Sequence, residues 1–470
     1  MSGASGSASG SPGAPIATVA APRRCGDARA AVREVPPESA WRRFAIVAAL
    51  VARIYAGYKL VQLTTRLGWP NARTRYARRD RRSARAVYRM AIRLEGLPIK
   101  VCQFLGSRAD ILPADYVTIL SRLQDRVPPR PLAVIAGAIE RELGRPWREV
   151  FTELDPAPLA SASLAQVHRG RLRDGREVAV KVQYPDIARL VAIDLKNFAF
   201  LVRVLARLEP DFDFRIVTDE VEKYVPRELD FAVEADNADR MRRALADRSD
   251  VVVPLVVREL STKRLLVMAY EPGVRITDVE ALHRLGIDPK DLARRLLEVF
   301  CEQMLGHGFF HADPHPGNIL VRSDGRLVLL DFGLAKDLPP GFAAGIARLA
   351  AAIMSGDRAA VAAAFRALGF KTRDDSDESL WWLGEAFLGW TIRNKRAYAD
   401  RELVNLVNAE MPRIMRANPI VELPGDILLV GRVLGLLSGI GKQLGSEVDV
   451  AAVLTPYLAR AMFGGAPRGA

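Results

Sequence analysis

The segment Gly308-Phe-Phe-His-Ala-Asp-Pro-His-Pro-Gly-Asn-Ile-Leu-Val321, followed by Leu329-Leu-Asp-Phe-Gly333, decides the fold of this chain. Asp313 and Asn318 stand five positions apart, with two prolines between them that stiffen the backbone. Asp331 follows an apolar run, Leu327 to Leu330. Carboxylate and amide oxygens are hard donors of the kind that Mg²⁺ prefers. The segment therefore predicts a polar loop with metal-binding capacity.

The spacing from Asp313 to Asn318 reproduces the catalytic loop H-R-D-x-x-x-x-N of kinases, with Ala312 in place of the arginine. Asp331-Phe-Gly333 matches their metal-binding D-F-G. Phosphoryl transfer needs positive charge against the phosphate oxygens and a carboxylate oriented at the nucleophile. We therefore predict that Asp313 is the catalytic base and that Asn318 and Asp331 hold Mg²⁺.

A strand lysine precedes this segment in the order that kinases require. Pro158 to Asp186 predicts a hairpin around an Arg-Asp-Gly turn, and its second strand, Glu177 to Gln183, contains Val-Ala-Val-Lys181. Lys181 would pair the α- and β-phosphates of ATP. Each motif alone has an ordinary structural explanation, such as a surface lysine or a turn histidine, but their joint order favours phosphoryl chemistry. Helical spacing of apolar residues further predicts a buried helix over 291–305 below the loop.

The composition is that of a folded protein of 470 residues, with 49% hydrophobic and 26% charged residues. Sixty-eight Lys and Arg against 55 Asp and Glu give a net charge of +13, which favours acidic partners. Three scattered cysteines exclude a disulfide framework and a four-cysteine zinc site.

These segments resemble the UbiB/AarF family of atypical, protein-kinase-like proteins over about residues 95 to 340. The resemblance implies an α+β, bilobal protein-kinase-like fold, with an N-terminal helical K-x-G-Q extension and a largely helical C-lobe. The expected divisions are a flexible tail (1–38), a helical basic region (39–98), the extension (99–131), the N-lobe (132–270) and the C-lobe (271–465).

The family replaces the glycine-rich nucleotide loop of protein kinases by an alanine-rich loop. Because alanine has less backbone freedom than glycine, altered nucleotide handling is expected, and the resemblance implies restrained autophosphorylation and a preference for ADP. Ala165 is a departure, since the family keeps a glycine there. The adenine is expected against the backbone at Met268, ahead of a hinge at Tyr270 to Gly273. The expected loop contacts are Ala160, Ser161, Ala162, Ser163, Leu164, Ala165, Gln166 and Val167.

The K-x-G-Q signature appears as Lys100-Val-Cys-Gln103, with Cys102 replacing the glycine and expected to be a small buried hydrophobe. The E-x-D signature is Glu228-Leu-Asp230. In relatives these carboxylates contact the lysine of the extension and the metal region, so Lys100, Gln103, Glu228 and Asp230 join the predicted catalytic set. A helix glutamate is expected to pair Lys181, and periodicity leaves Glu220 and Glu222 as alternatives.

Two N-terminal segments bear on contact with a membrane. Phe44 to Leu63 is apolar but contains Arg53 and Lys59, so a packed helix is favoured over a span, with a surface-lying helix between the two. The next segment suits anionic headgroups or a solvated helix face; it carries Arg73, Arg75, Arg78, Arg79, Arg81, Arg82, Arg85, Arg89 and Arg93. Residues 1–38 carry no secretory signal pattern, and an organelle transit peptide remains the alternative to a tail.

The C-terminal part is expected to be helical and Ala-rich, with Trp381, Trp382 and Trp390 in a core. The apolar stretch Ile427 to Ile440 is too short for a span. The resulting expectation is a Mg²⁺-dependent, ATP- or ADP-binding kinase or ATPase that supports isoprenoid quinone biosynthesis or lipid metabolism. We expect the protein to lie in the cytoplasm, peripherally on a membrane, and to have no nucleic-acid partner. The alternatives are a small-molecule kinase of the aminoglycoside or choline kind and a non-catalytic nucleotide-binding scaffold. The acceptor and the oligomeric state are not set by the sequence.

Overall fold

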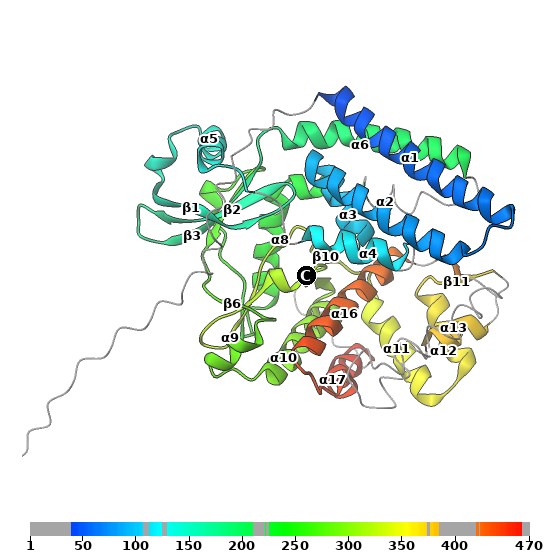
Figure 1. The fold of residues 1–470 in the computed structure, drawn as a ribbon. Helices are drawn as coiled ribbons and strands as arrows, with labels where there is room; N and C mark the ends of the chain where they lie inside the picture. The colour runs from blue at the N-terminus through cyan, green and yellow to red at the C-terminus, as the bar shows by residue number, and fades with distance from the viewer. Residues whose placement is uncertain are drawn as a thin grey trace, which may run out of the picture. The chain divides into compact units, whose positions relative to one another are not determined.

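The fold is seen in a computed structural model of the chain (Figure 1). It describes residues 39–106, 112–124, 129–209, 221, 225–373, 377–384, 420–422 and 424–462. The predicted tail, residues 1–38, lies outside these ranges, as do Glu220, Glu222 and Trp390.

Helices form the N-terminal part. Arginines tie α2 back to α1: Arg75 donates to the hydroxyls of Thr64 and Thr65, and Arg79 donates to the Ile54 carbonyl at 3.1 Å. Two of the nine arginines predicted as a basic surface therefore stabilise the helix pair. The elements are α1 (Ala40–Arg66), α2 (Ala72–Leu94), α3 (Leu97–Gly106), α4 (Ala114–Leu120) and η1 (Ser121–Gln124).

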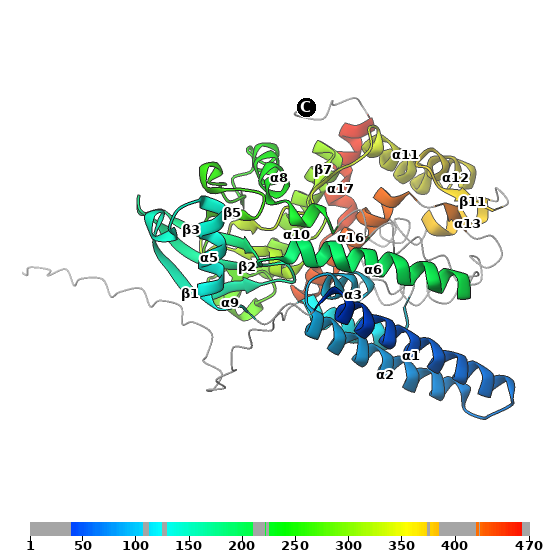
Figure 2. The ribbon, with the colours of Figure 1, turned by 90° about the horizontal axis from the view of Figure 1, so that it is seen from above.

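Helix α1 packs against α2 and against α6 (Ile187–Leu208), and α1 and α6 lie side by side in both views (Figures 1 and 2). A buried ion pair joins α1 to α6, because Arg43 donates to Asp194 at 2.9 Å. Arg43 also donates to the Leu94 carbonyl of α2. Among the described residues, α1 is the one helix long and apolar enough to cross a membrane, by length and composition, and 6% of its apolar window is buried. The expected packing thus holds on two sides of α1, whose exposed large apolar side chains are Trp41, Leu60 and Leu63.

An antiparallel sheet in the order β1-β2-β3-β5 carries the predicted hairpin. Side chains alternate along a strand, so Val180 and Val182 enter an apolar core shared with Ile135 and Ile139, and Lys181 faces the opposite side. The elements of this lobe are α5 (Leu132–Leu143), η2 (Trp147–Glu149), β1 (Phe151–Ser161), β2 (Ala165–Leu172), β3 (Glu177–Gln183), η3 (Arg227–Leu229), α8 (Phe231–Ala244), η4 (Arg258–Leu260) and β5 (Leu265–Ala269). Between α8 and η4 the chain forms β4 (Val251–Val252), which joins the sheet of the second lobe.

The second lobe is mainly helical. Its small sheet has the order β4-β9-β8-β6, and β7 pairs with β10. Its first elements are β6 (Val274–Arg275), α9 (Val279–Arg284), α10 (Pro289–Cys301), the π-helical turn η5 (Glu302–His307), β7 (Phe309–Phe310), η6 (Pro316–Asn318), β8 (Ile319–Val321), β9 (Leu327–Leu329) and β10 (Lys336–Asp337). The later elements are α11 (Phe342–Ser355), α12 (Arg358–Ala367), β11 (Lys371–Thr372), α13 (Asp377–Gly384), β12 (Ile420–Glu422), α16 (Gly425–Gln443) and α17 (Val450–Met462).

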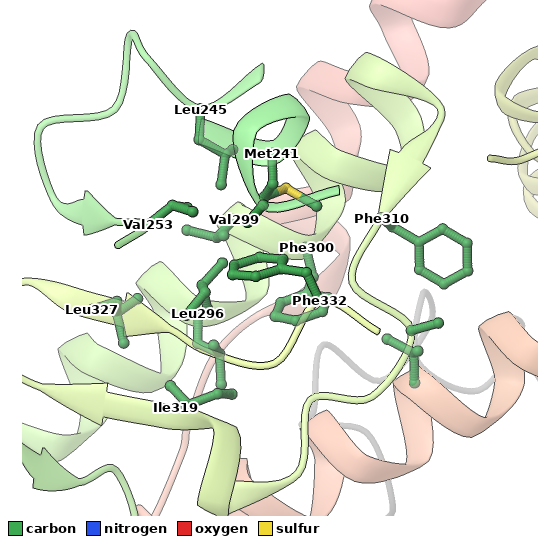
Figure 3. Close-up of a cluster of buried hydrophobic side chains, with 14 of the residues drawn as sticks. Met241, Leu245, Val253, Leu296, Val299, Phe300, Phe310, Ile319, Leu327 and Phe332 are labelled. Carbon is green, nitrogen blue, oxygen red and sulfur yellow. The ribbon is translucent and has the colours of Figure 1, made fainter. Parts of the chain in front are cut away.

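The predicted helix over 291–305 is confirmed as α10 and the turn η5. Leu296, Val299 and Phe300 are buried on one face, next to Phe332 (Figure 3). This core supports the loop between β7 and β8 and the segment after β9. It therefore fixes the backbone on which the predicted site residues stand.

The C-terminal helices form a further apolar cluster around α11, α12 and α13. Trp381 packs against it and is partly buried, and Trp382 is half-buried. The apolar stretch 427–440 forms α16, whose Val433, Leu437 and Ile440 enter the core of the second lobe.

Candidate active site

Lys181 stands at the centre of the site. Its ammonium nitrogen lies 2.7 and 2.8 Å from the two carboxylate oxygens of Glu234 and 3.5 Å from Oδ2 of Asp331. Desolvation alone would lower the pKa of Lys181, but the charges of Asp331 and Glu234 outweigh it and raise that pKa. Lys181 therefore carries a fixed positive charge opposite the D-F-G segment.

The helix glutamate that pairs Lys181 is Glu234 of α8, whose two carboxylate oxygens both accept from the ammonium group. Glu220 and Glu222, the two alternatives from the sequence, lie outside the described residues. A signal for Glu234 was present in the sequence. It falls on the apolar stripe of its helix, which holds Phe231, Ala235, Ala238 and Met241 at helical spacing. A carboxylate buried on this stripe needs a cationic partner. The position of Glu234 therefore indicates that a cation from another element packs against this face of α8.

The D-F-G segment is held in one conformation. Asp331 has φ of +60°, a left-handed value that is uncommon outside glycine, and its Oδ1 accepts from the Gly333 N–H at 3.3 Å. The side chain of Asn237 donates to the Phe332 carbonyl at 2.9 Å. Desolvation raises the pKa of Asp331, but the charge of Lys181 outweighs it, so that pKa is lowered. Asp331 is thus an ionised, half-exposed carboxylate of fixed direction.

The loop that carries Asp313 is organised by His311. The Asp313 N–H donates to Nδ1 of His311 at 3.2 Å, and Nε2 of His311 lies 2.8 Å from the Leu330 carbonyl. The first bond makes Nδ1 an acceptor, so the second requires the proton on Nε2. The ring also meets Phe332 edge to face, 5.4 Å between centroids. His311 therefore links the catalytic loop to the D-F-G segment.

Asn318 connects the loop that carries Asp313, the predicted base, to the segment that carries Asp331, the other predicted metal ligand. Its side-chain amide donates to the Asp313 carbonyl at 3.1 Å, and its own carbonyl accepts from the Leu330 N–H at 2.9 Å. Leu330 directly precedes Asp331. Short contacts therefore bring Lys181, from a remote strand, together with Asp331 and with the loop that carries Asp313 and Asn318.

A further side chain that the sequence analysis missed reaches this loop. Nη2 of Arg432, on α16, lies 3.0 Å from Oδ1 of Asp313. The local sequence around Arg432 is an apolar helix with a single charge, which gives no sign of its partner.

The alanine-rich loop is a tight turn. The Ala162 N–H donates to the Ala165 carbonyl at 2.8 Å, and the Tyr184 N–H donates to the Leu164 carbonyl at 3.0 Å. Ser163 and Leu164 are buried. The loop is therefore anchored to the sheet at its tip, with Ala160 and Ser161 ending β1 and Ala165, Gln166 and Val167 beginning β2.

Gln166 is fully buried and fastens this strand to the end of the extension. Its oxygen accepts from the Arg130 N–H at 2.8 Å, and its amide donates to the Arg130 carbonyl at 3.1 Å. The same amide nitrogen lies 2.8 Å from Nε2 of His168. Gln166, which the sequence predicted as a nucleotide contact, thus links β2 to the end of the extension.

The two family signatures meet through one ion pair. Nζ of Lys100 lies 2.6 Å from Glu228. Gln103 instead donates to the Leu123 carbonyl at 2.9 Å, within the extension. Asp230 caps α8 by accepting from the Ala232 N–H at 3.0 Å. Lys100 and Glu228 therefore lie beside the site, and in the structure Gln103 and Asp230 hold the backbone.

Cys102 is buried in an apolar cluster with Ile99 and Leu123. Burial raises the pKa of its thiol to about 12. The expected small buried hydrophobe is confirmed at this position.

Met268 lies on β5, paired with Ala179 of β3, and is nearly buried. The chain then continues as Tyr270, whose N–H donates to the Glu177 carbonyl at 3.0 Å, and reaches β6. The predicted hinge thus follows β5, with Met268 and Lys181 on adjacent strands of one sheet.

The donor set suits Mg²⁺. Asp331 and Asn318 offer one carboxylate and one amide, and no group of three or more His, Cys, Asp or Glu that could hold a metal occurs among the described residues. Mg²⁺ takes few protein ligands and completes its shell with water and phosphate oxygens. A site of two protein ligands next to a phosphate-binding lysine fits that preference.

The sheet, the lysine–glutamate pair, the loop aspartate and the D-F-G segment together define a protein-kinase-like protein. A family model, the ABC1 atypical kinase-like domain, matches residues 122–365. The chain belongs to this ABC1/AarF (UbiB) family, which confirms the resemblance and the predicted kinase-like fold.

Relatives of known name agree. AarF domain-containing protein kinase 1 from Xenopus tropicalis is 33% identical over 391 residues, covering 79% of this chain and 72% of that protein. Probable serine/threonine-protein kinase abkD from Dictyostelium discoideum is 31% identical over 431 residues, 89% of this chain and 61% of that protein. The chloroplastic protein ACTIVITY OF BC1 COMPLEX KINASE 8 from Arabidopsis thaliana is 33% identical over 399 residues, 78% and 52% respectively. The chain thus spans less than two thirds of the length of the last two proteins.

The solved structure of Rv3197 from Mycobacterium tuberculosis, in complex with erythromycin, is similar to this chain. It has a TM-score of 0.60 and 27% identity and covers 79% of this chain and 93% of its own.

Proposed function

We propose that this protein is a Mg²⁺-dependent, ATP-binding atypical kinase or ATPase of the UbiB type. The observation that carries the proposal is the placement of Lys181 between Glu234 and Asp331, with Asp313 and Asn318 linked to the same segment. Lys181 binds phosphate oxygens, and Asp313 orients the acceptor hydroxyl or water. Asn318 and Asp331 hold Mg²⁺, which supplies charge neutralisation at the phosphates.

The acceptor that we propose is a small molecule or lipid rather than a protein. Protein kinases carry their regulatory phosphosite between D-F-G and a later A-P-E. Here α11 begins at Phe342, and the eight residues 334–341 contain no Ser, Thr or Tyr. The ion pair between Lys100 and Glu228 also brings the extension to the site. The similar structure with erythromycin supports an acceptor of small-molecule size. In line with the family, we propose a role in isoprenoid quinone or lipid metabolism.

We also propose that the protein acts peripherally at an anionic membrane surface. The exposed large apolar side chains of α1 and the turn after it include Leu60, Leu63, Leu67 and Trp69. On α2, Arg78, Arg82, Arg85 and Arg89 are exposed at helical spacing. Apolar and basic residues on one helix pair suit the boundary of a bilayer.

The first experiment measures nucleotide binding and ATP turnover with Mg²⁺. Lys181→Met and Asp331→Asn should each reduce turnover by about 10²-fold or more, because each removes charge stabilisation at the phosphates. Lys290→Met, which removes an exposed lysine far from these contacts in sequence, is the control. ATP turnover that is unchanged in both variants would refute the proposed enzymatic function of this site. Nucleotide binding without turnover in the wild type favours the scaffold alternative. Phosphorylation of an aminoglycoside or choline without any response to a phenolic quinone-precursor mimic favours the small-molecule kinase alternative.

The second experiment measures sedimentation with vesicles of neutral or anionic lipid. Replacing Arg78, Arg82, Arg85 and Arg89 by Gln should abolish binding to anionic vesicles at physiological salt. A matched control replaces four exposed arginines elsewhere, Arg141, Arg284, Arg348 and Arg460. Equal loss in both variants would point to net charge alone and overturn the assignment to α2.

A further inference from the structure

Arg432 approaches the candidate base from a helix far along the chain. Nη2 of Arg432 lies 3.0 Å from Oδ1 of Asp313, and 34% and 27% of the two side chains are exposed. A partly buried pair of this kind is less screened by solvent than a surface pair. The contact is therefore strong enough to set the direction of the carboxylate.

The helix that carries Arg432 is itself firmly seated. Val433, the next residue, is fully buried, and Leu437 and Ile440 continue the same apolar face into the core of the second lobe. At the start of α16, Asp426 pairs with Lys336 of β10, just after the D-F-G segment. Arg432 thus projects from a rigid support, as a positioning residue requires.

The catalytic loop supplies no cation of its own beside Asp313. Protein kinases have a lysine two residues past the base, and this chain has His315 there. Nδ1 of His315 accepts from the Gly317 N–H at 3.1 Å, inside the turn. Lys181 is engaged by Glu234 and Asp331. In the part of the chain that the structure describes, the positive charge next to Asp313 therefore comes from Arg432.

We propose that Arg432 is a positioning residue for the reaction of this site. It holds Oδ1 of Asp313 and leaves Oδ2 to orient the acceptor hydroxyl or water. The inference rests on the proposed function and adds to it a role for the C-terminal helix. The bond uses one N–H of the guanidinium rather than a two-bond fork, so the positive charge is the essential property.

The test compares Arg432→Met, Arg432→Lys and Lys442→Met in the full chain. Lys442 is an exposed cation on the same helix and serves as the control. Arg432→Met should lower kcat by about 10²-fold and leave the nucleotide dissociation constant within about threefold of the wild type, since the residue acts through Asp313. Arg432→Lys should recover at least about tenfold of that loss, and Lys442→Met should behave as the wild type. Melting temperatures of all four proteins should agree within a few degrees.

Three results would overturn the inference. An unchanged or higher kcat in Arg432→Met would mean that the contact is idle or restrains the base. A loss of kcat with an equal loss of nucleotide binding and melting temperature would mean a structural role. A lysine variant no better than the methionine variant would mean that charge is not what Asp313 requires. Lys181→Met is assayed in parallel: retained turnover there refutes the proposed function itself, whereas its loss with an unaffected Arg432→Met refutes only the role of Arg432.

Discussion

Lys100 of the N-terminal extension forms an ion pair of 2.6 Å with Glu228, which directly precedes the segment that caps α8. Helix α8 carries Glu234, the partner of Lys181. The extension is therefore joined through one pair to the turn η3, which leads into the helix that positions Lys181. Desolvation raises the pKa of Asp331, and the charge of Lys100 helps that of Lys181 to lower it.

Removing Lys100 should destabilise this junction. Lys100→Met leaves Glu228 mostly buried without its cation, so we expect the free energy of unfolding to fall by about 1–3 kcal/mol. Urea unfolding measures it. The matched control is Lys290→Met, which breaks the exposed pair of Lys290 with Glu447 and should cost less than about 1 kcal/mol. Equal losses in the two variants would contradict a structural role for the Lys100 pair.

The pH dependence of stability should reveal Glu234. Desolvation, opposed by Lys181 and aided by Asp331, raises the pKa of this carboxyl from 4.5 to about 7. An acid with a raised pKa binds its proton more tightly in the folded protein than in the unfolded chain. The stabilisation that this proton gives is complete at pH values below the pKa of the unfolded chain, and it is lost as the pH rises towards 7. Between pH 5 and 8 the melting temperature of the wild type should therefore fall more than that of Glu234→Gln. Parallel curves would contradict the raised pKa.

The buried amide of Gln166 should resist replacement by a carboxylate. Nδ1 of His168 lies 2.7 Å from the Asp155 carbonyl and must donate to it, so Nε2 accepts from Gln166. Burial lowers the pKa of His168, which keeps the ring neutral. Gln166→Glu cannot donate to His168 or Arg130 when ionised, and we expect a loss of about 1–3 kcal/mol at pH 7.

The loss in Gln166→Glu should shrink at pH 5, where protonation of the new carboxyl restores a donor. Thermal melting at the two pH values measures this. An equal loss of stability at both pH values would show that the shape of the side chain, and not its hydrogen bonding, explains the effect of Gln166→Glu.

The buried pair of Arg43 and Asp194 should hold α1 on α6. Arg43→Met leaves a buried carboxylate without its cation, and we expect a loss of about 3–5 kcal/mol in the stability of this helix contact. Hydrogen exchange of α1 measures it locally. The double variant Arg43→Met with Asp194→Leu should recover most of the loss, because no charge is left buried. A double variant as unstable as the single one would contradict this electrostatic account.

Local patterns predicted the elements of the site well. The strand Glu177 to Gln183 has the same bounds in the structure, and the apolar stripe of α10 is buried as its spacing requires. Both follow from side-chain periodicity, which nearby residues encode. The positions of Asp313, Asn318 and Asp331 followed in the same way from motif spacing within short segments.

The partners of these residues were decided by the tertiary structure. Glu234, which the sequence analysis did not name, meets Lys181, and Arg432 meets Asp313 from a helix more than a hundred residues away. A charge on a helix shows only which face it occupies, and which charge lies opposite depends on how distant helices pack. The local sequence was enough to predict candidate groups for binding phosphate and metal and their order along the chain. Only the folded chain decided which cations and carboxylates neutralise one another, because contacts between remote elements are set by the packing of apolar faces that many side chains share.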